Sequence, residues 1–88
     1  MSKQPKTYTI VKTNFRTDQE YRQTGTLEEL LEAYRYTLEC GKSYEHEKGN
    51  KKINLNPKSA KSLVTQLNNA VNNSAANGFS NYSYQLED

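Results

Sequence analysis

The sequence predicts a small α+β domain with its elements in the order strand, strand, helix, helix, strand, in which a three-stranded, mostly antiparallel sheet carries both helices on one face. Three observations predict it: an early segment rich in β-branched and aromatic residues, two amphipathic segments with helix-capping signals, and a late segment of alternating polarity. This arrangement buries the apolar faces of both helices and of the sheet against one another. Eighty-eight residues allow one such domain with one thin core.

The first two strands are expected to form a hairpin. TYTIVKTNF, residues 7–15, is rich in residues that favour extended backbone. TDQ, residues 17–19, has the composition of a turn. EYRQT, residues 20–24, is then expected to return beside the first strand, with Tyr21 and Gln23 on one face.

The two ends of the chain complete this arrangement. Residues 1–6 are polar, include a proline and are expected to be disordered, so the domain spans residues 7–88. NYSYQLE, residues 81–87, alternates in polarity and is expected to be the third strand. It is expected to pair beside the first strand, which leaves an open sheet edge that could accept a strand from a partner.

The first helix has the clearest signals. Thr26 is the expected N-cap, and Glu29 completes a capping box. The helix is expected to end near Cys40, with Gly41 in the left-handed conformation that follows many helices. Its apolar face carries Leu27, Leu30, Leu31, Tyr34 and Leu38.

The second helix is expected to begin with Asn56 as its N-cap and Pro57 as its first residue, and to close at Gly78. Its apolar face carries Ala60, Leu63, Val64, Leu67, Ala70 and Val71. Its other face is unusual because asparagine is a poor helix former. The asparagines expected to be exposed there, as helix filler or as a flat hydrogen-bonding face for a partner, are Asn68, Asn69, Asn72 and Asn73.

Charge is distributed unevenly along the chain. The net charge of +2 is too small for a dedicated binder of nucleic acid or of an acidic membrane surface. Residues 42–61, however, contain six lysines and two glutamates, a net charge of +4. A loop of residues 42–56 and the start of the second helix are therefore expected to form an electropositive corner suited to an anion or an acidic partner. The alternative is a solvated linker whose lysines keep the protein soluble.

This basic loop is longer than most connections between helices, which favours a functional role. Gly49 and Asn50 are suited to a turn between two short strands, and Tyr44, Ile53 and Leu55 are expected to anchor the loop. The side chains expected to bind a partner are Lys42, Tyr44, His46, Lys48, Asn50, Lys51, Lys52, Lys58, Lys61, Asn69 and Asn73.

No combination of residues indicates catalysis or metal binding. His46 lies between two glutamates, but a metal site needs three or four ligands at matched spacing, and the sequence has no second histidine. Cys40 lies near the partial negative end of a helix, which disfavours a thiolate, and is expected to be half-buried. Because a phosphate-binding loop and a nucleophile–base pair are also lacking, an enzyme, a cofactor and a metal are not expected.

The seven tyrosines allow a nucleic-acid interpretation, because aromatic side chains on a sheet can stack on bases. Those placed to fill the core are Tyr8, Tyr34, Tyr82 and Tyr84. Those expected to be exposed are Tyr21, Tyr36 and Tyr44. Base stacking is therefore the less favoured interpretation.

Cysteine usage and hydropathy predict the compartment. A single cysteine excludes an internal disulfide and indicates a reducing environment. No apolar run approaches the roughly 20 residues needed to span a bilayer, and MSKQPK lacks the apolar stretch of a secretory signal. The protein is expected to be cytoplasmic.

The segment TGTLEELLEAYRYTLE and the residues that follow it, up to Ser80, resemble small accessory proteins of tailed bacteriophages. The most distinctive phrases are GKSYEHEKGNKKIN and LNNAVNNSAANG. The resemblance implies a protein made in the host cytoplasm that binds a host or phage macromolecule, sometimes to inhibit a polymerase, a nuclease or a defence system. It carries over no site residue, and the mild positive charge departs from inhibitors that mimic DNA.

The sequence therefore predicts a non-enzymatic protein that binds a host or phage macromolecule through the basic loop and the start of the second helix. A protein partner is favoured over nucleic acid. Two alternatives remain open. The same lysines could bind nucleic acid or an anionic ligand weakly. An exposed sheet edge could instead form a homodimer in which the loop is only a linker.

Overall fold

The structure is a computed structural model that describes residues 6–74 and 81–87. Its elements are β1 (Thr7–Asn14), β2 (Gln19–Thr26), α1 (Leu27–Ser43), α2 (Ala60–Asn73) and β3 (Tyr82–Glu87). The predicted element order and α+β class are confirmed. The disordered tail expected for residues 1–6 lies outside the described residues except for Lys6, and so does the helix end expected at Gly78.

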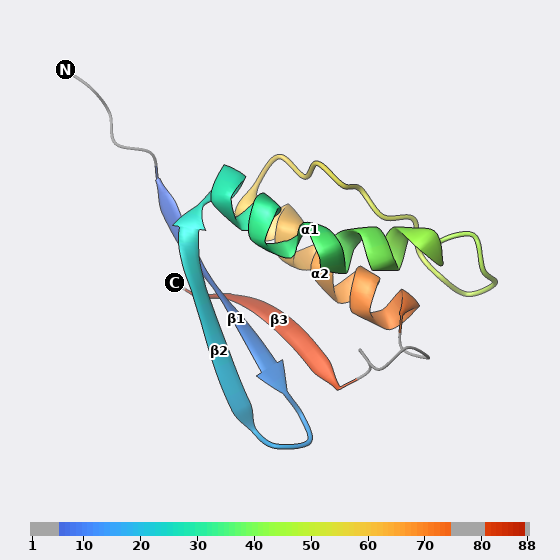
Figure 1. The fold of residues 1–88 in the computed structure, drawn as a ribbon, viewed down its shortest axis with the longest axis horizontal. Coiled ribbons are helices and arrows are strands. Elements are labelled where there is room, and N and C mark those ends of the chain that lie inside the picture. Colours follow the sequence, from blue (N-terminus) through green and yellow to red (C-terminus); the bar gives the residue numbers. More distant parts are fainter. Residues whose placement is uncertain (1–5, 75–80, 88) are drawn as a thin grey trace.

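The sheet has the order β2-β1-β3, and both pairings are antiparallel. The third strand pairs beside the first, as predicted. Both helices lie to one side of the three strands (Figure 1). Ile10 of β1 is fully buried, and its ladder partners Gln23 and Leu86 share its face, because paired residues in an antiparallel ladder point the same way.

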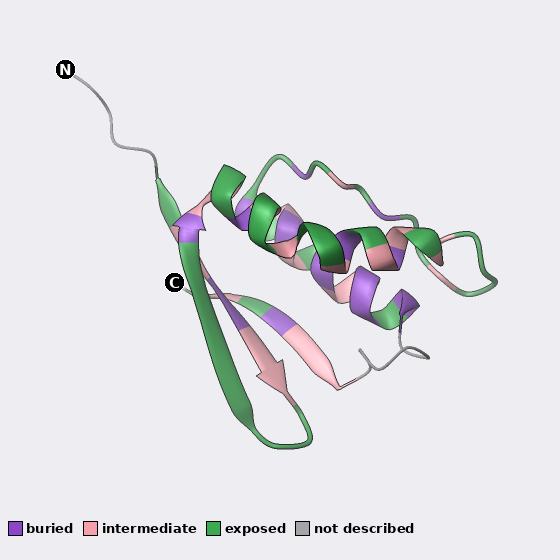
Figure 2. Ribbon diagram, viewed as in Figure 1, coloured by how far each residue is buried: buried purple, intermediate pink, exposed green. Residues whose placement is uncertain are grey.

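The core lies where the sheet and the two helices face each other (Figure 2). Its buried cluster consists of Ile10, Leu30, Leu38, Ile53, Leu63, Leu67, Ala70, Val71 and Tyr84. Partly buried residues packed against it are Tyr8, Leu27, Leu31, Tyr34, Leu55, Val64 and Leu86. The predicted apolar faces of both helices are therefore confirmed.

Tyr84 is the most deeply buried aromatic residue of this core. Its ring meets that of Tyr34 edge to face, with centroids 5.6 Å apart, an arrangement that aromatic pairs prefer. Burial raises the pKa of Tyr84 to about 12 and also raises the pKa of Tyr34, because an ionised phenol would lose its hydration. Both hydroxyls stay protonated at neutral pH.

Helix α1 begins as predicted but ends later. Thr26 Oγ1 accepts a hydrogen bond from the Glu29 N–H, and the Glu29 carboxylate accepts one from the Thr26 N–H, which completes the capping box. The predicted end near Cys40 is wrong, because α1 continues past Gly41. A Cβ at Gly41 would lie 2.4 Å from the Cα of Ala70, so this glycine allows the two helices to approach closely and forms no left-handed cap.

The predicted start of α2 is wrong as well. Ser59 is its N-cap, and its Oγ accepts a hydrogen bond from the Ser62 N–H at 3.1 Å. The Asn56 N–H donates to Oδ1 of Asn54 at 2.9 Å, so Asn56 belongs to a local turn. Pro57 is buried in the connection ahead of the helix. Helix α2 therefore begins at Ala60, the first residue of its apolar face.

The hairpin is regular and longer than predicted, because β2 extends beyond the expected residues 20–24 on both sides. Asp18 closes the turn with a φ of 60°, and its N–H donates to the Asn14 carbonyl at 2.8 Å. Aspartate is one of the few residues besides glycine that tolerate this conformation. Almost all of β2 is exposed, as Figure 2 shows.

Candidate functional site

The predicted contact surface lies on the connection between α1 and α2, Tyr44–Ser59, called the interhelical loop below. The Glu47 N–H donates to the Tyr44 carbonyl, and the Asn50 N–H donates to the Glu47 carbonyl, so two turns shape its first part. Asn50 Nδ2 also donates to the Tyr44 carbonyl at 2.8 Å, and Gly49 has a φ of +87°. The predicted short hairpin is wrong, because the loop forms no strand and its backbone bonds to side chains instead.

A buried asparagine of α2 holds the middle of the loop. Asn73 is only 5% exposed. Its Nδ2 donates to the carbonyls of Lys51 at 2.7 Å and Gly41 at 3.1 Å, and its Oδ1 accepts from the Lys51 N–H at 3.0 Å. Its side chain thus pairs with Lys51 as a neighbouring strand would. The prediction that Asn73 is exposed is wrong, because the loop backbone needs hydrogen-bond partners and Asn73 supplies them.

The other asparagines of α2 have separate environments. Asn68 Nδ2 donates to the Tyr84 carbonyl at 3.0 Å, and its Oδ1 accepts from the Tyr84 N–H at 2.8 Å. Asn69 is half-buried, and Asn72 is exposed. The predicted exposed asparagine face therefore does not form, because Asn68 and Asn73 turn toward backbone groups of packed segments.

A carboxylate at the start of the loop binds the second half of the loop. Glu45 Oε2 accepts a hydrogen bond from the Ile53 N–H at 2.9 Å, and Oε1 pairs with the Lys42 ammonium at 3.1 Å. The hydrogen bond from Ile53, followed by the contact with Lys42, holds the pKa of Glu45 below its ordinary value, and the charge of Lys52 adds to this. The charge of Lys42 is therefore compensated within the chain.

Apolar contacts anchor the second half of the loop to the core. Ile53 is 2% exposed and belongs to the core cluster, and Leu55 packs against it. Tyr44 is half-buried, so the prediction that it is exposed is wrong, and it is not among the residues packed against the core. The Asn54 N–H donates to Oε1 of Gln66 on α2 at 2.9 Å. The predicted anchoring by Ile53 and Leu55 is confirmed.

A groove of about 490 Å³ runs along this part of the loop. It is lined by Lys42, Lys52, Ile53, Asn54, Leu55, Asn56 and Gln66. The fold brings Lys42 and Lys52 together from two sides of a turn. A groove lined by apolar and basic side chains could bind a ligand or side chain in which an acidic group is attached to an apolar chain.

The other predicted contact residues of this region surround the loop. The exposed ones are His46, Lys48, Lys51, Lys52, Lys58 and Lys61. Within residues 6–74 and 81–87, none of them forms an ion pair. The charges of the five lysines are therefore available to a partner.

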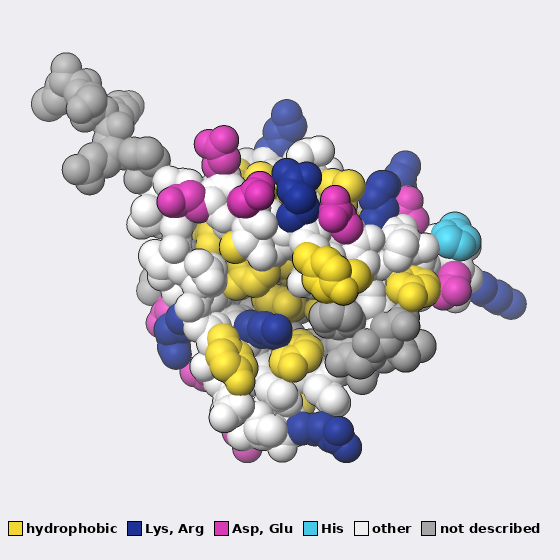
Figure 3. Space-filling view, in the orientation of Figure 1, with side chains coloured by type: hydrophobic (Ala, Val, Ile, Leu, Met, Phe, Trp, Pro, Cys, Tyr) yellow, Lys and Arg dark blue, Asp and Glu magenta, His cyan; other side chains and the backbone are white. Residues whose placement is uncertain are grey.

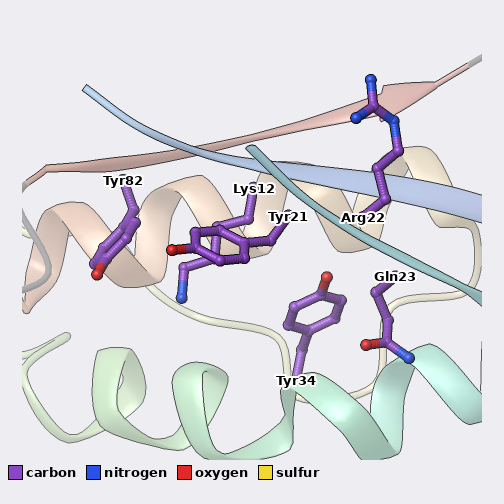
Figure 4. A pocket seen from close by; sticks show the side chains of 6 residues that line it. All are labelled: Lys12, Tyr21, Arg22, Gln23, Tyr34 and Tyr82. Carbon is purple, nitrogen blue, oxygen red and sulfur yellow. The ribbon is translucent and has the colours of Figure 1, made fainter. Parts of the chain in front are cut away.

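A second cleft, of about 410 Å³, opens between the hairpin and α1 (Figure 4). It is lined by Lys12, Tyr21, Arg22, Gln23, Tyr34 and Tyr82. Lys12 Nζ lies 4.1 Å from the centre of the Tyr82 ring, a cation–π contact. The Arg22 side chain points away from the cleft in Figure 4.

Sequence reasoning missed this tyrosine-lined cleft. Figure 3 shows hydrophobic side chains on either side of a basic one on the same face of the molecule. The alternation in β2 places Tyr21 and Gln23 together, but only strand pairing adds Lys12. Tyr21 is 52% exposed and Tyr36 is 71% exposed, as predicted. The prediction that Tyr82 fills the core is wrong, because Tyr82 is half-buried at this cleft.

The part of the chain that the structure describes has neither a cluster of metal ligands nor a membrane-spanning helix. Among residues 6–74 and 81–87, no group of three or more His, Cys, Asp and Glu side chains could hold a metal ion. In the same part of the chain, no helix has the length and apolar character to cross a bilayer. Cys40 is half-buried, as predicted.

No protein-family model, curated protein or solved structure matches this chain. The resemblance to bacteriophage accessory proteins therefore stays a prediction. The geometry and charge of the interhelical loop and its surroundings are the basis for the function proposed below.

Proposed function

We propose that this chain is a non-enzymatic binding protein whose interhelical loop engages an acidic surface of a partner protein. The observation that carries the proposal is the buried Asn73 amide, which bonds both backbone groups of Lys51. It gives the loop a defined shape, so its lysines are presented on a preorganised surface. A preorganised loop loses less conformational entropy on binding than a free linker does.

The charges around the loop support an acidic partner. Lys48, Lys51 and Lys52 are exposed and form no ion pair within the described residues. Lys52 also borders the groove that contains Ile53 and Leu55. A partner glutamate or aspartate could pair with Lys52 while its neighbours contact the apolar part of the groove.

A protein partner fits this surface better than a nucleic acid does. The net charge of +2 gives little long-range attraction to a polyanion. The groove also mixes apolar and polar lining, whereas a phosphate backbone requires a continuous basic surface. By the resemblance to bacteriophage accessory proteins, we propose a bacterial host or phage protein as the partner class, with inhibition of a host enzyme as one consequence.

Affinity capture from a bacterial lysate, with and without nuclease treatment and read by mass spectrometry, tests the proposal with three baits. These are the wild type, the loop variant Lys51→Glu/Lys52→Glu, and the control Lys6→Glu/Arg16→Glu. The control makes the same change in net charge at exposed residues outside the loop. A protein captured by the wild type and the control, but lost with the loop variant, is the expected result.

A fourth bait, Asn73→Ala, tests the shape of the loop separately from its charge, because it keeps every lysine. For a captured partner we expect roughly tenfold weaker binding in calorimetric titration, since the loop must then be ordered on binding. Identical capture by all four baits would overturn the proposal. Capture that disappears with nuclease and weakens steeply with salt would instead establish nucleic-acid binding.

A further inference from the structure

The two edges of the sheet differ in what covers them. On β3, the side chain of Asn68 bonds to both the N–H and the carbonyl of Tyr84. These two backbone groups therefore point away from β1 and toward α2. Helix α2 thus occupies the middle of the β3 edge, where an incoming strand would have to bind.

The direction of the Tyr84 groups also shows which groups of β2 are free. Because the backbone groups of Tyr84 point away from β1, those of its ladder partner Lys12 point toward β2, where they bond to the backbone of Tyr21. Backbone groups alternate in direction along a strand. The backbone groups of Glu20, Arg22 and Thr24 therefore point away from β1, toward the open side of β2. Within the described residues, the backbone groups of these three make no hydrogen bond outside the ladder.

The free edge of β2 also lacks several of the features that usually prevent strand addition, and its two charged residues, Glu20 and Arg22, have opposite signs. The strand is eight residues long and contains neither proline nor lysine. Its register with β1 runs without interruption from Thr7↔Thr26 to Asn14↔Gln19, so no bulge twists it away. All its residues from Gln19 to Thr24 are exposed.

We propose that this edge binds a second copy of the same chain, with two β2 strands pairing antiparallel about Tyr21 to form a continuous six-stranded sheet. Within one copy, Arg22 already pairs with Glu20 at 3.3 Å and with Glu87 at 3.2 Å. In the register about Tyr21, Glu20 of each copy also faces Arg22 of the other, so these ion pairs extend across the interface on the outer face of the sheet. The backbone groups of Glu20 and Arg22 are the free ones, so both pairs can also form ladder hydrogen bonds. The charge pattern of the strand is thus complementary to itself.

The register centred one residue further along is disfavoured. It would place Arg22 of one copy directly opposite Arg22 of the other, and like charges in that position repel. The register centred on Tyr21 also pairs two half-exposed aromatic rings. Tyr21 is 52% exposed and lies at the tyrosine-lined cleft, so pairing would cover it on the face that carries the helices.

This inference goes beyond the proposed function and is independent of it. The interhelical loop lies between α1 and α2, and its lysines take no part in the β2 edge. A dimer would carry two such loops, which raises avidity for a partner with repeated acidic surfaces. Loss of the dimer and loss of partner capture are therefore separate outcomes.

Sedimentation velocity over a range of protein concentrations tests the dimer. We expect the wild type to show twice the monomer mass at the upper end of the range. Glu20→Arg should be monomeric, because it places arginine opposite arginine twice. The double variant Glu20→Arg/Arg22→Glu, made in a Glu87→Gln background because Glu87 contacts residue 22 within each copy, restores opposite charges across the interface, so it should recover the dimer. A wild type that stays monomeric, or a double variant that behaves like the single one, would overturn the proposal.

Cross-linking tests the register. In a Cys40→Ala background, Tyr21→Cys should form an intermolecular disulfide under mild oxidation, because directly opposed non-hydrogen-bonded residues have Cα atoms about 4.5 Å apart. Gln23→Cys, on the same strand and the same face, is the matched control and should not cross-link. Equal cross-linking of both, or cross-linking of Gln23→Cys alone, contradicts pairing about Tyr21.

Discussion

Strand β2 of the β1–β2 hairpin and the interhelical loop are both polar and mostly exposed, yet they are held in different ways. The hairpin is held by a ladder of eight residue pairs, from Thr7↔Thr26 to Asn14↔Gln19. The loop has no ladder, and its backbone bonds to single side chains such as Asn73 and Glu45. In the hairpin the hydrogen bonds come from the backbone itself, whereas in the loop they come from particular residues.

This difference has a consequence for mutation. A ladder tolerates the replacement of most side chains, because the backbone groups remain. An irregular loop depends on each side chain that satisfies its backbone, because a buried unpaired group is costly. Single substitutions should therefore be severe around the loop and mild in β2, although both segments are mostly exposed.

The largest effect is expected for Ile53→Ala. Ile53 is 2% exposed and is the part of the loop that enters the core cluster. Removing its side chain leaves a cavity, which lowers the free energy of unfolding by about 3 kcal/mol. Urea denaturation measures it, with the half-buried Leu55→Ala as the milder comparison. A loss below about 1 kcal/mol would mean that the loop does not depend on this anchor.

Asn73→Ala should have the next largest effect, about 2–3 kcal/mol, because it leaves both backbone groups of Lys51 without their partner. The neighbouring Asn72→Ala is the matched control: Asn72 is exposed, so its replacement should change stability by no more than about 0.5 kcal/mol. Hydrogen exchange at the Lys51 amide should accelerate in the first variant only. Equal effects of both substitutions would remove the distinction between the two asparagines.

Glu45→Gln tests how the stability of the interhelical loop depends on pH. The folded-state pKa of Glu45 lies below its ordinary value, so the ionised carboxylate stabilises the fold above that ordinary value. This contribution is lost as the pH falls through the lowered pKa. Nuclear magnetic resonance of the Ile53 amide should show the loop loosening over this acid range in the wild type, and Glu45→Gln should show no such transition. An identical acid transition in both proteins would assign it to other carboxylates.

The smallest effect is expected in the hairpin, for Thr24→Ala. The Thr24 hydroxyl bonds to the Thr9 hydroxyl at 2.8 Å on the exposed face of the sheet. Its removal leaves every ladder hydrogen bond in place, so the expected loss is about 0.5 kcal/mol. Thermal denaturation under conditions where the protein is monomeric measures it. A loss as large as that of Asn73→Ala would contradict the comparison between the two segments.

Local signals in the sequence were sufficient for the elements and their order. The capping box of Thr26 and Glu29 involves residues three positions apart, so it can be recognised without any tertiary information. The alternation from Tyr82 to Leu86 likewise predicts a half-buried strand, and β3 is one. Of the predicted site, the anchors Ile53 and Leu55 are confirmed, because apolar residues in a polar loop are stabilised by packing against the core.

Two of the errors, at Gly41 and Asn73, concern residues whose roles depend on distant segments. Gly41 resembles a helix cap, but its contact is with Ala70 on the other helix. Asn73 resembles a surface residue, but its partner is Lys51, which is 22 positions away in the chain. Neither contact leaves a local pattern, because close packing and hydrogen-bond satisfaction depend on which segments meet.

The sequence by itself therefore determined the element types, the two amphipathic helix faces and the concentration of lysines near the interhelical loop. The tertiary structure alone decided which asparagines are buried, where the tyrosine-lined cleft opens and which sheet edge is free. The side chain of Asn68 covers the edge of the sheet at β3, whereas the edge at β2 is exposed. Periodicity and capping arise between residues a few positions apart, whereas burial and the pairing of backbone groups arise only when distant segments pack together.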